Sequence, residues 1–347
     1  MVRKDNSIVS RTKVFFERLS YTFSNLTVHG PSFIVRKDVH YIARFIYFLI
    51  YVQIWIAVIY TIRKYYNHYQ ENTIRFTTRA DYLKWNTTFP SITVCEILNV
   101  DKIWALHQRL YGEPEEGRLD RFVGDIAFFG GTCHSCSSTC NSELQCPTDL
   151  LGVVGKFRSP CKNLFLDCKW NGKRINCCET FKPIQTEFGT CFSANNMHLV
   201  QDKLLLVAAD YKGASAVLEL DLSQDYEAFL HSPEDIPFWN MEYDRRVTVV
   251  YGAQAAMTFS IMDVVNEPEV SLTPPEVRKC RFFDELPDNY FAYNVYSYSV
   301  CITQCRIDAQ LQLCNCTHHL SPLAYKNRFC DLEGLKCLTR HHNELRD

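Results

Sequence analysis

The feature that most constrains the fold is an apolar run near the N-terminus, Phe45–Ile62, with the sequence FIYFLIYVQIWIAVIYTI. Its eighteen residues contain no charged side chain and a single amide, Gln53. As an α-helix they would rise about 27 Å, close to the thickness of the hydrocarbon core of a bilayer. A core helix is seldom free of charge over this length, and a cleavable signal peptide would start nearer the N-terminus. The run therefore predicts a transmembrane helix over 45–62, preceded by a short segment, 1–44.

Cysteine is distributed unevenly about this predicted helix. All 17 cysteines lie between Cys95 and Cys337, and the first 94 residues contain none. Cysteine-rich stretches of this kind are typical of disulfide-bonded, extracellular domains. Residues 1–44 carry eight Lys and Arg against three Asp and Glu, which favours a cytoplasmic N-terminus. We therefore expect residues 63–347 to be extracellular, with Asn86 of the sequon Asn-Thr-Thr as a glycosylation site.

Local patterns predict a mixed α+β class for the extracellular part. TFPSITVCEIL, 88–98, has β-branched and apolar residues on both faces, which indicates a buried strand. Residues 131–191 hold nine cysteines and little apolar periodicity, so we expect a loop-rich lobe held by disulfides. Residues 199–262 lack cysteine and contain three stretches that look like strands of one sheet, separated in part by the loop HSPEDIP, 231–237. From Asn289 onward the pattern turns helical.

Two cysteine clusters could carry chemistry. CITQCRIDAQLQLCNCTHHLSP, 301–322, places Cys and His at spacings that suit tetrahedral zinc. Cys133-His-Ser-Cys136 matches the redox C-x-x-C pattern. In an extracellular domain with this many cysteines, disulfides are the expected alternative for both. We therefore assign no metal ligand and no cofactor.

Other function classes lack their signatures. The sequence has no G-x-S-x-G, no H-E-x-x-H, no P-loop and no G-x-G-x-x-G, so no catalytic residue is assigned and an enzyme is not expected. The formal charge of −2 gives no electrostatic reason to expect nucleic acid as a partner.

Five further stretches occur in a fixed order around the predicted helix. They are FSNLTVHG (23–30), FPSITVC (89–95), FKPIQTEFGTCFSANN (181–196), HSPEDIPF (231–238), and RKCRF (279–283) leading into the cysteines of 301–322. Together they resemble the degenerin/epithelial sodium channel family, and most closely its insect pickpocket branch.

The resemblance implies a trimeric, amiloride-sensitive-type channel that conducts sodium across the plasma membrane. Each family subunit has two membrane helices and an ectodomain with a β palm, a knuckle, a finger and a helical thumb. Here 199–262 would supply palm strands, 131–178 the finger and knuckle region, and 280–337 the thumb. The implied partners are sodium ions, the lipid bilayer and other channel subunits in a homo- or heterotrimer.

The resemblance also implies roles for individual residues. His29 and Gly30 would influence gating from the cytoplasmic side. The implied disulfides are Cys95 with Cys191, Cys314 with Cys337, and Cys316 with Cys330. The eight cysteines of 133–178 could form four more bridges, whose pairing stays open. The partners of Cys280, Cys301 and Cys305 would lie on a returning helix beyond residue 347, which would leave these three unpaired by truncation.

The sequence departs from the family pattern at its end. Residues 45–62 are the one charge-free span long enough to cross a membrane, so we interpret the chain as truncated before the second, pore-forming helix. The predicted function is a sodium channel subunit that lacks this helix. The alternative is a non-conducting, single-pass membrane protein whose disulfide-rich ectodomain binds a ligand or partner.

Overall fold

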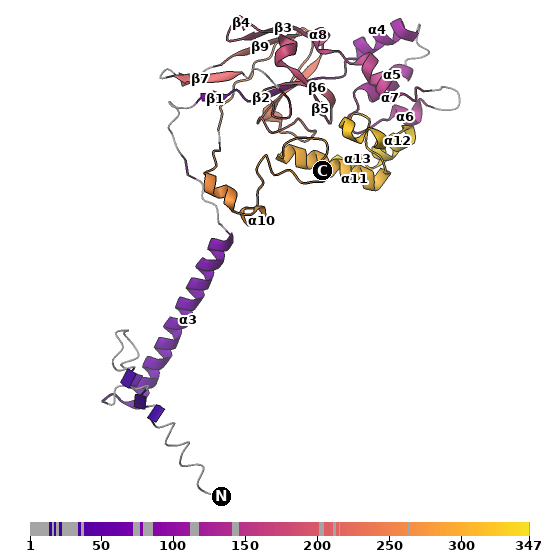
Figure 1. Cartoon of the computed structure of the whole chain (residues 1–347). Helices are drawn as coiled ribbons and strands as arrows, with labels where there is room; N and C mark the ends of the chain where they lie inside the picture. The colour runs from indigo at the N-terminus through magenta and orange to yellow at the C-terminus, as the bar shows by residue number, and fades with distance from the viewer. Residues whose placement is uncertain are drawn as a thin grey trace. The chain divides into compact units, whose positions relative to one another are not determined.

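The computed structural model describes residues 14–15, 17–18, 21–22, 34–35, 38–71, 77–78, 86–111, 118–140, 146–200, 205–210, 213–214, 216–262 and 264–346 (Figure 1). The chain divides into two compact units. One comprises residues 1–77 with 267–279, and the other comprises 78–266 with 280–347. The predicted gating residues His29 and Gly30 lie outside the described residues.

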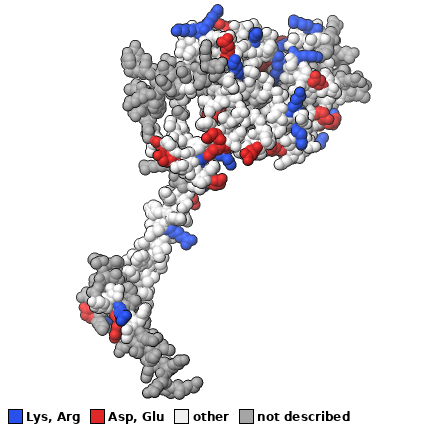
Figure 2. All heavy atoms as spheres, in the orientation of Figure 1, with Lys and Arg blue, Asp and Glu red and all other residues white. Residues whose placement is uncertain are grey.

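The first unit consists mainly of one long helix, α3 (Tyr41–Glu71), of 31 residues, none of which is buried. At 1.5 Å per residue it is about 46 Å long, so it extends beyond the predicted span at both ends. Figure 2 shows a largely uncharged surface along this helix, in contrast with the interspersed acidic and basic side chains of the second unit. Within the part of the chain that the structure describes, it is the one helix long and apolar enough to cross a membrane. The predicted apolar helix is confirmed, with wider bounds.

Two short turns complete the described part of the first unit. They are a 3-10 turn at Pro268–Leu272 and α10 (Pro275–Arg278).

The described part of the second unit contains three antiparallel sheets, and the largest has five strands in the order β11–β10–β2–β6–β5. Its strands are β2 (Ser91–Glu96), β5 (Lys182–Thr186), β6 (Gly189–Ala194), β10 (Tyr226–His231) and β11 (Arg246–Val249). A second sheet joins β1 (Asn86–Thr88), β7 (Leu206–Asp210) and β8 (Gly213–Ala214), and a third joins β4 (Lys173–Arg174), β3 (Phe165–Trp170) and β9 (Leu218–Leu222).

β2 is the central strand of the largest sheet, as its sequence predicts. Thr93 lies opposite Phe229 of β10 and Ser193 of β6. Side chains on both faces of β2 are buried, and the hydroxyls of Ser91 and Thr93 on one face are satisfied by Ser193 and His231. The disulfide between Cys95 and Cys191 crosses from β2 to β6 with the Cα atoms 4.5 Å apart, the narrow spacing of directly opposed antiparallel residues.

The prediction that the strands of 199–262 share one sheet is wrong. β7, β9 and β11 belong to three different sheets. β9 pairs with β3, which comes from the cysteine-rich lobe that was predicted to be loop-rich. Local alternation predicts that a stretch is extended, but the pairing partner depends on long-range contacts. Here the disulfide between Cys168 and Cys177 ties β3 to its own lobe.

Helices connect and follow the strands of the second unit. They are α4 (Val100–Tyr111), α5 (Arg118–Ala127), α6 (Ser135–Ser138), α7 (Leu150–Phe157), α8 (Cys161–Leu164), α9 (Cys177–Thr180), α11 (Tyr298–Cys314), α12 (Leu332–Arg340) and α13 (His342–Arg346), with 3-10 turns at Tyr243–Arg245 and Leu323–Arg328. Phe122 of α5 and Phe157 of α7 share a core with Leu335 and Leu338 of α12. This core joins segments some 200 residues apart (Figure 1).

Seven disulfides hold the second unit together. They join Cys95 to Cys191, Cys133 to Cys136, Cys140 to Cys146, Cys161 to Cys178, Cys168 to Cys177, Cys314 to Cys337, and Cys316 to Cys330. Four of them lie within 133–178, where the sequence left the pairing open. The other three join the pairs that the resemblance implied. The α+β class with a disulfide-rich domain after one apolar helix is confirmed.

Candidate functional site

The candidate site is the junction between the five-stranded sheet and α11, the longest helix of the second unit. α11 begins after Ser297, whose hydroxyl accepts a hydrogen bond from the backbone of Val300 at 3.2 Å. It ends at Asn315, which adopts the left-handed conformation that often terminates helices. Its buried side chains are mostly polar: Ser299, Thr303, Gln304, Arg306 and Gln310, with the apolar Val300 and Ile307. Buried polar groups need partners, and those partners form the junction.

The sheet contributes Glu187, which lies in the two-residue turn between β5 and β6. Thr186 and Gly189 close this turn as a register pair, and the Thr186 hydroxyl donates to the Gly189 carbonyl at 3.0 Å. Gly189 has a φ of +88°, and a Cβ there would lie 3.3 Å from both Arg158 and Leu320. The positive φ and these close neighbours favour glycine at the position that closes the turn containing Glu187.

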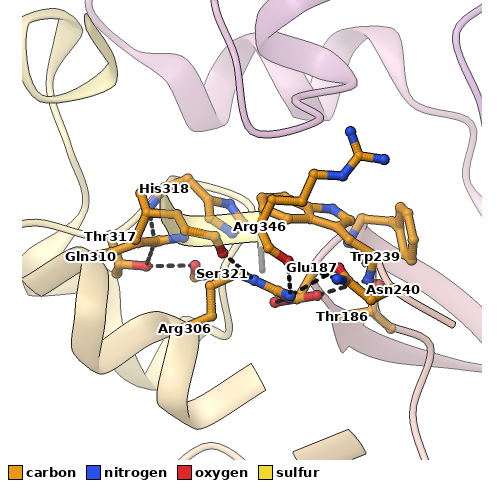
Figure 3. A network of polar contacts seen from close by, with 12 residues as sticks. Thr186, Glu187, Trp239, Asn240, Arg306, Gln310, Thr317, His318, Ser321 and Arg346 are labelled. Atoms are coloured by element: carbon orange, nitrogen blue, oxygen red, sulfur yellow. Dashed lines mark hydrogen bonds and ion pairs between the residues drawn. The ribbon is translucent and has the colours of Figure 1, made fainter. Parts of the chain in front are cut away.

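Arg306 of α11 forms an ion pair with Glu187 (Figure 3). The two side chains are 4% and 3% exposed. The remaining donors of the guanidinium are satisfied by backbone and amide oxygens: Nε donates to the Leu345 carbonyl at 2.8 Å, and Nη2 donates to Asn240 Oδ1 at 3.1 Å. Arg306 therefore joins the helix at once to the sheet and to the C-terminal α13.

The second oxygen of Glu187 is also bound. Glu187 Oε2 accepts a hydrogen bond from the Trp239 backbone at 3.0 Å, and the Trp239 ring lies 5.1 Å from the guanidinium of Arg306. Burial raises the pKa of Glu187, and the Arg306 guanidinium opposes that rise. A buried ion pair of this kind depends on its geometry, because loss of one partner leaves an uncompensated charge in a dry site.

The adjoining turn after α11 continues the polar network. The Thr317 hydroxyl bonds Gln310 Oε1 and Ser321 Oγ, each at 2.7 Å. The ring of His318 stacks on Trp239 at 5.5 Å and lies 5.4 Å from the ring of Phe129. This turn is therefore wedged between the Arg306 network and the core of the short helices (Figure 3).

Two histidines of this turn are buried and neutral. Burial, together with the neighbouring His319 and Arg306, lowers the pKa of His318 to about 3. Burial likewise lowers the pKa of His319 to about 4, and Arg158 adds to the effect. His319 Nε2 lies 2.7 Å from the Ile126 carbonyl, so this ring nitrogen carries the proton and donates a hydrogen bond to α5.

A second attachment holds the start of α11. Asp235 Oδ1 accepts a hydrogen bond from Ser299 Oγ at 2.7 Å, and the Ile236 backbone donates to the same hydroxyl at 2.9 Å. Asp235 belongs to the loop HSPEDIP after β10. Nε2 of His231, the last residue of β10, lies 2.8 Å from the hydroxyl of Thr93 in β2. α11 is thus attached to the sheet at its first turn and again in its middle.

Disulfides brace the far end of α11. Cys314 at its last turn is bonded to Cys337 of α12, and Cys316 is bonded to Cys330. α11 is therefore attached to the rest of the second unit at three places: its first turn, its middle and its last turn.

The two cysteine clusters that were considered for metal binding or redox chemistry contain disulfides. Cys133 and Cys136 are bonded to each other. No group of three or more His, Cys, Asp or Glu among the described residues is arranged to hold a metal ion. Cys301 and Cys305 remain thiols on α11, the first half-buried and the second exposed, and Cys280 is exposed.

The sequence analysis did not single out Glu187, Arg306 or Asp235. Each lies inside a stretch that carried the family resemblance, namely 181–196, 301–322 and 231–238. The order of these stretches indicated the family, but it did not indicate which residues pair. The two members of the ion pair are 119 positions apart, so no local pattern connects them.

Comparison with known proteins identifies the family. A family model described as "Amiloride-sensitive sodium channel" matches residues 22–347. The chain is 22% identical to "Sodium channel protein Nach" of Drosophila ananassae over 90% of this chain and 64% of that protein. It is 22% identical to "Pickpocket protein 28" of Drosophila melanogaster over 98% of this chain and 62% of that protein. "Sodium channel protein Nach" of Drosophila melanogaster is 20% identical over 90% of this chain and 65% of its own length.

This chain therefore spans less than two thirds of the length of these curated relatives. The family model covers almost all of it, from the segment before the apolar helix to the last residue. The chain belongs to the degenerin/epithelial (amiloride-sensitive) sodium channel family, and it is similar to the insect Nach and pickpocket members.

Proposed function

We propose that this chain is a subunit of a sodium-conducting channel of the plasma membrane. The family is one of channels and not of enzymes. In this proposal α3 crosses the bilayer, with 1–44 in the cytoplasm and the disulfide-rich unit outside. The excess of basic residues before the helix and the seven disulfides after it support this orientation.

In the proposed subunit, the sheet acts as the palm and 280–337 acts as the thumb, with the finger and knuckle in 131–178. The observation that carries the proposal is the buried ion pair between Glu187 and Arg306. A displacement of the braced helices would pull on the β5–β6 turn through this pair, because separating the two buried side chains would leave each charge uncompensated away from water. The site is thus suited to pass motion from the thumb to the palm.

Other parts of the proposal concern residues and partners outside this junction. His29 and Gly30 would influence gating from the cytoplasmic side. Other family subunits would complete a homo- or heterotrimer around the sodium pathway. Asn86 would carry a glycan, because β1 follows the membrane helix on its outer side.

Voltage clamp of cells that express the full chain tests the proposal. The chain is expressed alone and together with Pickpocket protein 28, and surface arrival is measured by biotinylation. Co-expression is expected to change the amiloride-sensitive sodium current, and Arg306→Met is expected to remove that change at equal surface abundance. Lys336→Met is the matched control, since its partner Glu333 is 78% exposed. An unchanged current in every combination, with the chain at the surface, would overturn the proposal.

Orientation is tested separately with epitope tags at the two ends of the chain. In intact cells, antibody is expected to reach the C-terminal tag and not the N-terminal one. The reverse pattern would contradict a cytoplasmic N-terminus.

The alternative function is that of a non-conducting membrane protein whose disulfide-rich ectodomain binds a partner. α3 is the one helix in the described part of the chain that could span a bilayer. Under this alternative, the chain would associate with a channel subunit and reach the surface with it while leaving the sodium current unaltered.

A further inference from the structure

We infer that Asn315 carries an N-linked glycan, and that attachment of this glycan competes with closure of the Cys316–Cys330 disulfide. Asn315-Cys316-Thr317 is a sequon with cysteine in its middle position. The inference rests on the proposed function in one respect, because it requires residues 86–347 to enter the secretory compartment.

The folded structure has room for a glycan at this position. Asn315 is exposed and forms the C-cap of α11, with φ 57° and ψ 15°. Its Oδ1 accepts a hydrogen bond from Arg328 Nη2 at 3.0 Å. Among the described residues, no hydrogen bond holds its Nδ2, the atom to which a sugar is joined. A glycan on Nδ2 would leave both the helix cap and the Arg328 contact intact.

The third residue of the sequon is inaccessible once the chain has folded. Thr317 is 0% exposed, and its hydroxyl bonds Gln310 and Ser321. Its backbone is also engaged, because its N–H donates to the Arg328 carbonyl at 2.9 Å and its carbonyl accepts from the Cys330 N–H at 2.8 Å. An enzyme that reads the threonine must therefore act before this turn forms.

The disulfide sets the time available for that reaction. Cys316 is itself part of the sequon, and it bonds a cysteine only 14 positions away. Short loops close quickly relative to long ones. Once this bridge has formed, Thr317 is held against the segment 328–330. Closure of the bridge therefore ends the time in which the glycan can be attached, whereas an attached glycan does not prevent later closure. Asn315 is expected to be glycosylated in only a fraction of molecules.

The reaction is a group transfer with a defined balance. The Nδ2–C1 bond forms between Asn315 and the first sugar of a lipid-diphosphate-linked oligosaccharide, and the C1–O bond to the diphosphate breaks. The proton lost from Nδ2 balances the charge on the released diphosphate. A glycan at Asn315 would keep the C-terminal end of α11 in solvent. This end of the helix would then not contact another subunit.

The test uses the full chain expressed in insect cells, with gel mobility measured before and after peptide-N-glycosidase F. Asn315→Asp removes the acceptor nitrogen but keeps Oδ1 for Arg328. Thr317→Ser is the matched control, because it keeps both the sequon and the buried hydroxyl. Asn86→Gln and Asn25→Gln report the orientation. We expect a loss of one glycan-sized step in Asn315→Asp and no loss in Thr317→Ser.

The competition is tested by opening one disulfide at a time. Cys330→Ser frees the sequon cysteine from its bridge and should increase the glycosylated fraction at Asn315. Cys337→Ser opens the neighbouring bridge of α11 and should leave this fraction unchanged. An equal increase in both variants would overturn the competition, since slower folding in general would then be the cause.

The remaining outcomes separate the two proposals. If Asn315→Asp migrates with the parent chain while Asn86→Gln shifts, the glycan at Asn315 is refuted and the orientation stands. If Asn25→Gln is the variant that shifts, the orientation is wrong and the inference fails with it.

Discussion

Glu187 and Arg306 form a buried ion pair across 119 positions of the chain, between a β-turn and the middle of a helix. Both side chains are almost fully removed from water, and each has further hydrogen bonds to backbone atoms. A buried pair of this kind often adds little net stability compared with apolar residues of the same size. The pair does fix the position of α11 on the sheet, because any shift that separates the two groups leaves a buried charge without its partner.

Removal of one member of the pair is the most direct test of this role. Arg306→Met is expected to destabilise the folded chain by about 3–5 kcal/mol, because Glu187 would remain buried without a counter-charge. The double variant Glu187→Gln/Arg306→Met should lose less than the single one. The measurement is denaturant unfolding of the detergent-solubilised full chain, followed by tryptophan fluorescence.

The control for this prediction is an exposed ion pair. Lys336 and Glu333 lie 2.7 Å apart with Glu333 at 78% exposed, and such pairs contribute about 0–1 kcal/mol. Lys336→Met should therefore unfold at nearly the parent denaturant concentration. Similar losses in Lys336→Met and Arg306→Met would contradict the importance assigned to the buried pair.

Local sequence patterns predicted some parts of this structure and not others, for physical reasons. The apolar helix was predictable because eighteen uncharged residues leave few alternatives. β2 was predictable because β-branched residues and Cys95 dominate its sequence, and its place between β10 and β6 buries side chains on both of its faces. The pairing of β9 with β3 was missed, because alternation along a strand contains no information about its partner.

The candidate junction was even less accessible to local patterns. Arg306 lies in a helix whose buried face is largely polar, so no apolar periodicity marks which residues point inward. In the sequence Glu187 has the character of an ordinary, exposed turn residue. Its burial against Arg306 becomes visible only in the folded structure. The pairing of Glu187 with Arg306 could therefore be identified only from the three-dimensional structure.

The buried histidines predict a loss of stability in acid. Burial lowers the pKa of His318 to about 3 and that of His319 to about 4, against 6.5 in the unfolded chain. Between these values the unfolded chain binds more protons than the folded one, so stability is complete above pH 6.5 and falls as the pH falls toward 4. The loss should be on the order of 1–3 kcal/mol per histidine.

His318→Phe should make this pH dependence shallower. Phenylalanine keeps the stack with Trp239 and the contact with Phe129 but binds no proton. The free energy of unfolding is measured from pH 7.5 to 4.5 for the parent chain, for His318→Phe and for His341→Gln at the surface. If all three curves are parallel, the buried ring of His318 does not contribute to acid sensitivity.

The disulfide between Cys314 and Cys337 is expected to contribute more stability than the one between Cys140 and Cys146. The first closes a separation of 23 positions and the second a separation of six. A longer closed loop removes more freedom from the unfolded chain, and typical losses on removal are about 2–4 kcal/mol.

The double variants Cys314→Ser/Cys337→Ser and Cys140→Ser/Cys146→Ser allow the comparison. Denaturant midpoints of the unreduced proteins should be lower for the first. A larger loss in the second variant would mean that packing around these bridges, and not loop length, determines their contribution.

Cys301 and Cys305 provide a test of the outer face of α11. Cys305 is exposed, whereas Cys301 is half-buried and receives a hydrogen bond from the Tyr290 hydroxyl at 3.4 Å. In the unreduced full chain, a thiol reagent should modify Cys305 faster than Cys301, because attack requires access to the sulfur. Tyr290→Phe removes the hydroxyl donor and should change the rate at Cys301 alone.

Cys314, which is bonded to Cys337, serves as the internal control and should react only after reduction. Mass spectrometry of the labelled peptides identifies each site, and protection of both Cys301 and Cys305 before reduction would show that this face of the helix is covered or bridged in the expressed protein.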